Sequence, residues 1–289
     1  MTRTNFDVAD LSISEVADRT GIPASTLRMW EARYGFPEPR RPSGTHRRYS
    51  DEECRVLLQV KEARQRGLRM TAAIDAGLAA VRQAEDSILN GVRLRHPETP
   101  VLALPEPFML ALSTALEQTA SEHAHGVLVG AFQRLPAHRT TEAAWQELAT
   151  TARAAVVFAG FPECERVGAR WSIPVQSGTP LAEEWAVVCD TPTWWGCLVG
   201  REMRVRGPRR PGQRTFEAVW SLDPQVVRDA ARVAAALATT AAPELGDVVS
   251  GYLSLPPDAP PSALGEASRF TNRVLEHLLR AARAATRGG

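Results

Sequence analysis

The stretch that decides the fold is residues 12–49, which read SISEVADRTGIPASTLRMWEARYGFPEPRRPSGTHRRY. Ser12 and Glu15 have the S-x-x-E spacing of a capping box, which predicts a helix that begins directly after Ser12. Gly21 suits the end of that helix, and Pro23 fits the first turn of a second helix, where its missing N–H costs no hydrogen bond. Two short helices joined by a turn that contains glycine are typical of a helix-turn-helix.

The residues after the second helix predict a basic hairpin, or wing. Three prolines between residues 37 and 42 exclude a continuing helix, and Gly44 permits a tight turn. Between Arg28 and Arg48, six arginines stand against two glutamates, a formal charge of about +4. Arginine grips phosphate oxygens bidentately, so the pattern favours binding to a DNA backbone over a hairpin that is merely solvated. We expect DNA contacts from polar side chains of the second helix and the hairpin, namely Ser25, Thr26, Arg28, Arg33, Tyr34, Arg40, Arg41, His46, Arg47, Arg48 and Tyr49.

Three motifs recur in order here: Ser14–Ala17 with Thr20-Gly21, Thr26-Leu27-Arg28 with Trp30-Glu31, and His46-Arg47-Arg48-Tyr49. With them, about residues 10–85 resemble the MerR family of winged-helix transcription regulators. The resemblance implies a second helix in the major groove and wings that touch phosphates and the minor groove. It also implies dimers that bind pseudo-palindromic promoter sites and distort the DNA spacer.

Two further helices complete the first domain. Ser50 and Glu53 form a second capping box, and the helix they begin runs to about Arg66. Thr71 is expected to cap another helix over about residues 72–87. In the MerR family a long dimer helix often follows, but here residues 89–107 contain five interruptions by glycine or proline, which predicts a linker over residues 88–106.

Residues 107–242 predict a mixed α/β domain. Short apolar runs such as GVLVGAFQ and AAVVFAG suit buried strands, and EWAVVCD and WWGCLVGRE suit a hairpin around residues 191–193. Asp223 and Pro224 begin a closing amphipathic helix. The domain resembles the DICT sensory domain through short motifs: Ala131-Phe132-Gln133, Val156-Val157-Phe158, Pro180-Leu181 with Glu184-Trp185, Arg201-Glu202, and Phe216–Trp220 before Asp223-Pro224. The resemblance implies a sensing role, with no particular ligand or cofactor.

Tryptophans are concentrated in this second domain, where they favour core packing or the stacking of a flat ligand in a pocket. Because successive strand residues point to opposite faces, Trp194-Trp195 favours at least one exposed indole. The candidate ligand residues are Trp185, Trp194, Trp195, Arg201 and Trp220. Glu184 and Glu202 could pair as acid and base, but structural pairing with Arg170 or Arg201 is favoured. Common catalytic motifs are absent from the sequence, so no enzyme is expected.

The composition favours a cytoplasmic protein. No apolar run approaches the roughly 20 residues of a membrane span, and the first residues lack a signal-peptide core. The four cysteines form no C-x-x-C pair or disulfide framework. His123 and His125 would point apart on a helix, so no metal site is expected.

The tail, residues 243–289, predicts a proline-rich connector and a C-terminal helix over about residues 263–285. Its apolar stripe, which includes Phe270 and Val274, must be buried either on its own sensory domain or against a second copy. Since the usual dimer helix is missing, we expect dimerisation through the C-terminal half.

The expected fold class is therefore α+β: an all-α winged helix-turn-helix domain at residues 1–87, the linker, the sensory domain, and a terminal helix. The preferred function is a sequence-specific transcription regulator that binds double-stranded DNA as a homodimer. A small-molecule effector or RNA polymerase is a possible further partner, and no membrane is involved. The alternative is a nucleoid-associated or scaffold protein without effector control.

Overall fold

The computed structural model describes residues 11–40, 47–133, 135–203, 214–257 and 270–278, apart from residues 272 and 275 and the side chains of 83, 85 and 135–141. The fold class is α+β, as the sequence predicts. The chain divides into two compact units, one that ends at Glu85 and one that begins at Asp86.

The first unit consists of helices, which are α1 (Ile13–Thr20), α2 (Ala24–Tyr34), α3 (Asp51–Gln65) and α4 (Met70–Glu85). Both capping boxes are present, at Ser12 and at Ser50, and Gly21 ends α1 in the left-handed conformation with φ of 61°. The expected start of the fourth helix was wrong. It begins at Met70 rather than after Thr71, and it ends before Ser87.

The core of this unit lies between α1, α2 and α3. It contains the buried side chains Val16, Ile22, Leu27, Tyr49, Cys54 and Leu57, with Trp30 and Phe36 packed against them. Helices α3 and α4 approach closely at Gly77, where an added Cβ would lie 2.8 Å from Val60 Cγ2 and 3.1 Å from the carbonyl oxygen of Val56. Only glycine allows this contact without a shift of backbone.

The described strands of the second unit form one mixed sheet in the order β1-β8-β7-β6-β2-β3-β5-β4. Strands β2, β3 and β5 are parallel, and the other pairings are antiparallel. The hairpin predicted around residues 191–193 is confirmed as β6 and β7. The strand bounds are β1 (Leu102–Pro105), β2 (Val127–Ala131), β3 (Ala154–Ala159), β4 (Glu165–Val167), β5 (Arg170–Pro174), β6 (Glu184–Asp190), β7 (Trp195–Glu202) and β8 (Thr215–Ser221).

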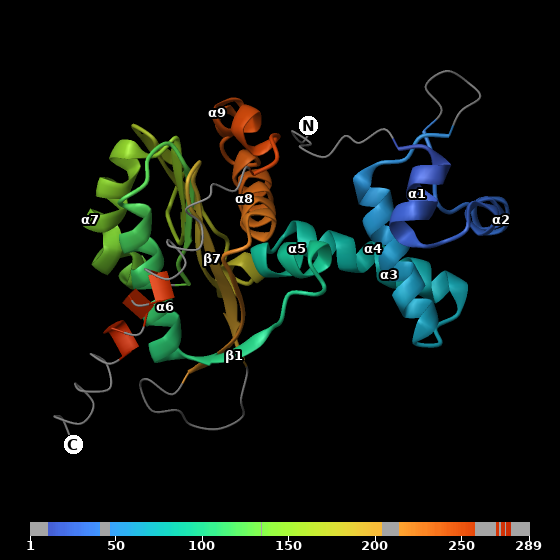
Figure 1. Cartoon of the computed structure of the whole chain (residues 1–289), viewed down its shortest axis with the longest axis horizontal. Helices are drawn as coiled ribbons and strands as arrows, with labels where there is room; N and C mark the ends of the chain where they lie inside the picture. The colour runs from blue at the N-terminus through green and yellow to red at the C-terminus, as the bar shows by residue number, and fades with distance from the viewer. Residues whose placement is uncertain are drawn as a thin grey trace. The chain divides into compact units, whose positions relative to one another are not determined.

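Helices cover both faces of this sheet (Figure 1). Helices α6 (Glu106–Ala120) and α7 (Leu135–Thr151) lie on one face, and α5 (Ile88–Arg95), α8 (Pro224–Thr239) and α9 (Glu244–Leu253) lie on the other. A 3₁₀ turn, η1 (Pro180–Glu183), leads into β6. Asp223 caps α8 through its carboxylate, and Pro224 occupies the first position, as the sequence predicts.

The predicted linker over residues 88–106 was wrong. The glycine and proline residues predict an irregular segment there, but the segment begins with a helix, α5, which is capped by Ser87. Helix α5 packs on α8, and β1 pairs with β8 at the sheet edge, where Pro105 costs no ladder bond. The first part of the expected connector is likewise helical, as α9, because Leu245, Val249 and Leu253 are buried.

The described residues of the C-terminal helix fold back onto their own unit, which is one of the two arrangements left open by the sequence. Phe270 is buried in the core between α6 and the sheet, and Val274 packs against that core. Arg273 donates a hydrogen bond to Thr119 Oγ1 at 2.8 Å and forms an ion pair with Glu122.

Candidate nucleic-acid interface and sensory-domain sites

Helix α2 presents one exposed face. Its members are Ser25, Arg28, Met29, Ala32 and Arg33, whereas Leu27 is buried and Trp30 packs on the core. Since each residue advances about 100° around a helix, the exposed residues share one side. Arg28 and Arg33 lie on its two flanks. Thr26 is half-buried at its edge, whereas Tyr34, also half-buried, lies toward the opposite side of the helix. The exposed face of α2 therefore has small polar and apolar side chains along its centre and one arginine on each flank.

The base of the wing is formed by a bridge between Arg40 and Arg48. The two backbones exchange N–H···O bonds of 2.9 Å in both directions. Arg40 is exposed and Arg48 is half-buried. The predicted contacts Arg41 and His46 lie outside the described residues.

Tyr49 cannot contact DNA as expected, because its side chain is 0% exposed within the core of the first unit. Its backbone is bonded in both directions to Leu11 at 2.9 Å. Burial raises the pKa of the Tyr49 hydroxyl. Tyr49 is therefore a core residue. The sequence motif alone does not show whether a tyrosine at this position is buried or exposed.

Arg47 lies in a different environment from the one expected for a phosphate ligand. Its Nε donates to Glu31 Oε2 of α2 at 2.7 Å, and this hydrogen bond raises the pKa of the Arg47 guanidinium. One of the predicted DNA-binding arginines, Arg47, is therefore part of an ion pair within the protein.

Two features of this unit were missed by the sequence reasoning. Met29 is 49% exposed on the presented face of α2, and its spacing of four from Ser25 could have indicated this. Lys61 Nζ donates to the carbonyl oxygen of Thr20 at 2.8 Å, which ties α3 to the turn of the helix-turn-helix. That contact joins residues far apart in sequence and left no local signal.

The predicted ligand residues of the second unit do not form one pocket. Trp194 and Trp220 both pack on Phe270, with ring centroids 5.8 and 6.2 Å apart. Trp185 donates to Ser113 Oγ at 3.0 Å and packs edge-on against Phe216.

Arg201 forms an ion pair with Glu217 at 2.6 Å. The prediction that one indole of Trp194-Trp195 is exposed was wrong, since the two residues are 3% and 4% exposed. Trp194 precedes β7 and is covered by the C-terminal helix, whose position no local pattern reveals.

Glu184 caps a helix instead of pairing with Arg170 or Arg201. Its carboxylate accepts hydrogen bonds from Ser87 Oγ and from the backbone N–H groups of Ile88 and Leu89, the latter two at 2.9 and 3.3 Å. It therefore holds the first turn of α5, where unpaired N–H groups favour negative charge. Burial raises the pKa of Glu184 to about 7.

Glu202, the other strand-edge carboxylate, pairs with Arg214 at 2.8 Å. The two glutamates thus have separate structural partners, which favours the structural interpretation over an acid–base pair.

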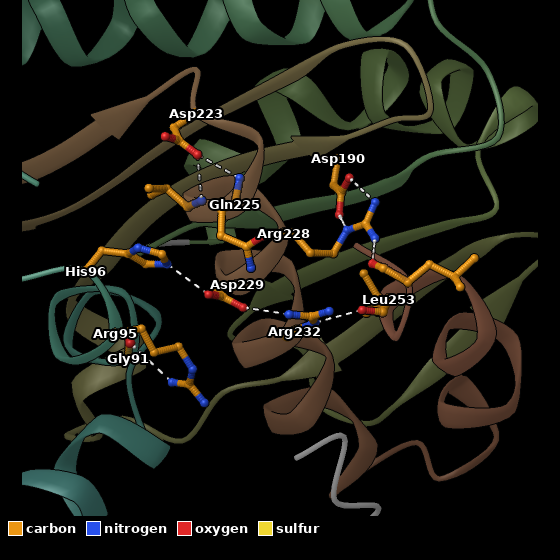
Figure 2. Close-up of polar contacts among 12 residues, drawn as sticks. Gly91, Arg95, His96, Asp190, Asp223, Gln225, Arg228, Asp229, Arg232 and Leu253 are labelled. Atoms are coloured by element: carbon orange, nitrogen blue, oxygen red, sulfur yellow. Dashed lines mark hydrogen bonds and ion pairs between the residues drawn. The ribbon is translucent and has the colours of Figure 1, made fainter. Parts of the chain in front are cut away.

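A chain of polar contacts joins α5, α8 and α9 (Figure 2). His96 Nε2 lies 2.8 Å from Asp229 Oδ2, Arg232 Nη1 lies 2.9 Å from Asp229 Oδ1, and Arg232 Nε donates to the carbonyl of Leu253 at 2.7 Å. Burial lowers the pKa of His96, but the bond to Asp229 and its charge outweigh this, so the net shift is upward.

Beside this chain of contacts, Arg228 forms a buried ion pair with Asp190, with Nη2 and Oδ1 3.1 Å apart (Figure 2). The Tyr252 hydroxyl contacts the same Asp190 oxygen at 3.1 Å. Desolvation makes such a pair costly to break, so this end of the sheet is fixed to α8 and α9.

The histidines considered as metal ligands are otherwise engaged or apart. His123 forms a hydrogen bond with Thr193 Oγ1 at 2.8 Å and stacks on Trp194. Among the described residues, no three histidine, cysteine or carboxylate side chains gather as metal ligands. No helix in the described part of the chain has the length and apolar character needed to cross a membrane.

Comparison with known families agrees with this division into units. Residues 11–76 match the model for MerR HTH family regulatory proteins, and residues 86–203 match DICT, a sensory domain in diguanylate cyclases and two-component systems. The chain thus carries a MerR-type helix-turn-helix domain followed by a DICT sensory domain.

Two curated relatives from Myxococcus xanthus resemble part of the chain. The HTH-type transcriptional repressor CarA is 44% identical over 66 residues, which cover 22% of this chain and 23% of CarA. The HTH-type transcriptional repressor CarH is 34% identical over 61 residues, 21% of this chain and 20% of CarH. The chain therefore spans less than a quarter of either relative.

Proposed function

We propose that this protein is a DNA-binding transcription regulator whose DICT domain senses a ligand or a protein partner. The observation that carries the proposal is the single exposed face of α2, with Arg28 and Arg33 on its flanks, in a unit that matches MerR regulators. The names of the two relatives, both transcriptional repressors, support the same function.

In this proposal α2 enters the major groove and the wing follows the backbone. Ser25, Thr26 and Met29 face base edges, while Arg28 and Arg33 contact phosphates on either side. From the wing, Arg40 and Arg48 add phosphate contacts. The role is one of binding rather than catalysis.

We further propose that two copies bind a pseudo-palindromic promoter site. Half-sites one helical turn apart suit a two-fold symmetric dimer. The sensory domain would bias binding through an effector or a contact to RNA polymerase, and no cofactor is assigned.

The test is selection of duplexes from a random library by the purified full-length protein, followed by footprinting. Protection confined to one inverted repeat is the expected result, and it supports a sequence-specific regulator. Uniform coverage of unrelated duplexes would instead identify a nucleoid-associated or scaffold protein.

A further inference from the structure

We propose that Arg47 is a positioning residue, which fixes the wing against α2 through Glu31, and that it does not bind DNA phosphate. The inference rests on the proposed DNA-binding function. It assigns to one arginine of the basic hairpin a task different from that of its neighbours.

The first support is the geometry of the ion pair. Arg47 Nε lies 2.7 Å from Glu31 Oε2, and the side chains of Arg47 and Glu31 are 33% and 18% exposed. Glu31 follows the buried Leu27 by about one helical turn, so it lies at the border between the inward side of α2 and the flank that carries Arg28. The guanidinium of Arg47 is therefore drawn toward the core side of the helix.

The second support is the alternation of side chains along the wing. In extended chain, successive side chains point to opposite sides, and directly bridged residues point to the same side. Tyr49 is fully buried, so Arg47, two residues before it, shares the inward side. Arg48 and its bridge partner Arg40 then share the outward side.

The third support is charge. Because the Arg47 charge is compensated by Glu31, it releases no counterion on binding, whereas Arg40 can replace ions at the phosphates. A partly exposed ion pair adds little stability. What it supplies is orientation, because it joins the return strand of the hairpin to the C-terminal half of the helix presented to DNA.

The experiment measures binding of full-length protein to a selected duplex by fluorescence anisotropy over a range of NaCl concentrations. The variants are Arg47→Gln, Glu31→Gln, the double variant, and Arg40→Gln as the matched control. Thermal unfolding verifies that each is folded, and a Glu31→Arg/Arg47→Glu swap serves if a single variant is not.

We expect Arg47→Gln and Glu31→Gln each to weaken binding by up to about fivefold, the upper end of the range for a partly exposed pair, with the salt slope unchanged. The double variant should be no weaker than either single one, because both lose the same contact. The control should reduce the slope by about 0.9, the value for one lost phosphate contact.

The proposal is overturned if Arg47→Gln flattens the slope as the control does while Glu31→Gln tightens binding by releasing a cation. A wild-type protein that binds no duplex contradicts the proposed function instead. In that case amide hydrogen exchange tests the inference. The bridged N–H groups of Arg40 and Arg48 should exchange faster in Glu31→Gln and Arg47→Gln than in the wild type, and unchanged exchange refutes the positioning role of Arg47.

Discussion

The carboxyl of Glu184 shows how one buried side chain makes stability depend on pH. Burial raises its pKa from 4.5 to about 7, so between these values the folded state keeps a proton that the unfolded state has released. Stability should therefore fall as pH rises from 4.5 through 7. At 1.36 kcal/mol per pKa unit the loss is about 3 kcal/mol.

Urea unfolding at a series of pH values measures this loss. Glu184→Gln should flatten the decline below pH 7, and a variant that keeps the wild-type slope would contradict the assignment. His96→Asn is the control. The raised pKa of His96 gives stability that is fully present below pH 6.5 and is lost as pH rises through the pKa of the folded state, so this variant should keep the decline between pH 4.5 and 6.5.

Residue identity alone left the surroundings of several side chains undetermined. The motif His46-Arg47-Arg48-Tyr49 marks a wing, but it does not say that Tyr49 is buried or that Arg47 faces Glu31. Both facts depend on how the strand docks on α2. A charged residue read from sequence is a candidate contact until its neighbours across the fold are known.

At the scale of elements, the helix starts that carry a capping box were the most predictable features. The capping boxes at Ser12 and Ser50 are local, since each bond spans three residues, and both are confirmed. The error over residues 88–106 has the opposite origin. Helix α5 depends on Glu184, nearly a hundred residues away, and on packing against α8, so glycine and proline in the sequence were misleading.

Gly77 gives a prediction about the contact between α3 and α4. Gly77→Ala gains helix propensity of about 1 kcal/mol but places a methyl group against backbone atoms of α3, and overpacking of this kind typically costs about 1–3 kcal/mol. We expect a net loss of stability in the first unit, measured by thermal unfolding. Gly251→Ala is the matched control in α9, where an added Cβ meets nothing within 4 Å, and it should be neutral or stabilising. Equal effects of the two variants would refute the close packing.

Phe270 gives a prediction about the C-terminal helix. Its buried ring packs on Trp194 and Trp220, so Phe270→Ala should cost about 3–5 kcal/mol and expose both indoles. Tryptophan fluorescence should shift to the red. His277→Ala, a change on the same C-terminal helix that removes an exposed hydrogen bond to Gln118, is the control. Unchanged fluorescence in the Phe270 variant would show that the helix is not seated there.

At the scale of the whole molecule, assembly is the open proposal. We expect a protein truncated after Leu255 to be monomeric by light scattering, because the sequence predicts dimerisation through the C-terminal half. A truncated dimer that survives dilution would place the interface elsewhere. Full-length Phe270→Ala keeps the residues of the C-terminal helix but removes its packing on the core. If this variant is still a dimer while the truncated protein is a monomer, the truncation has removed a dimer contact.

The short passage between the two units has a mechanical consequence. Helix α4 ends at Glu85 and Ser87 already caps α5, so Asp86 alone separates them. Glu184 accepts hydrogen bonds from the first turn of α5, and Asp229 contacts His96 at the end of the helix, so α5 is fixed at both ends to the second unit. The chain between the two units is therefore a few backbone torsions long, unlike the long flexible tether that the sequence predicts after residue 87.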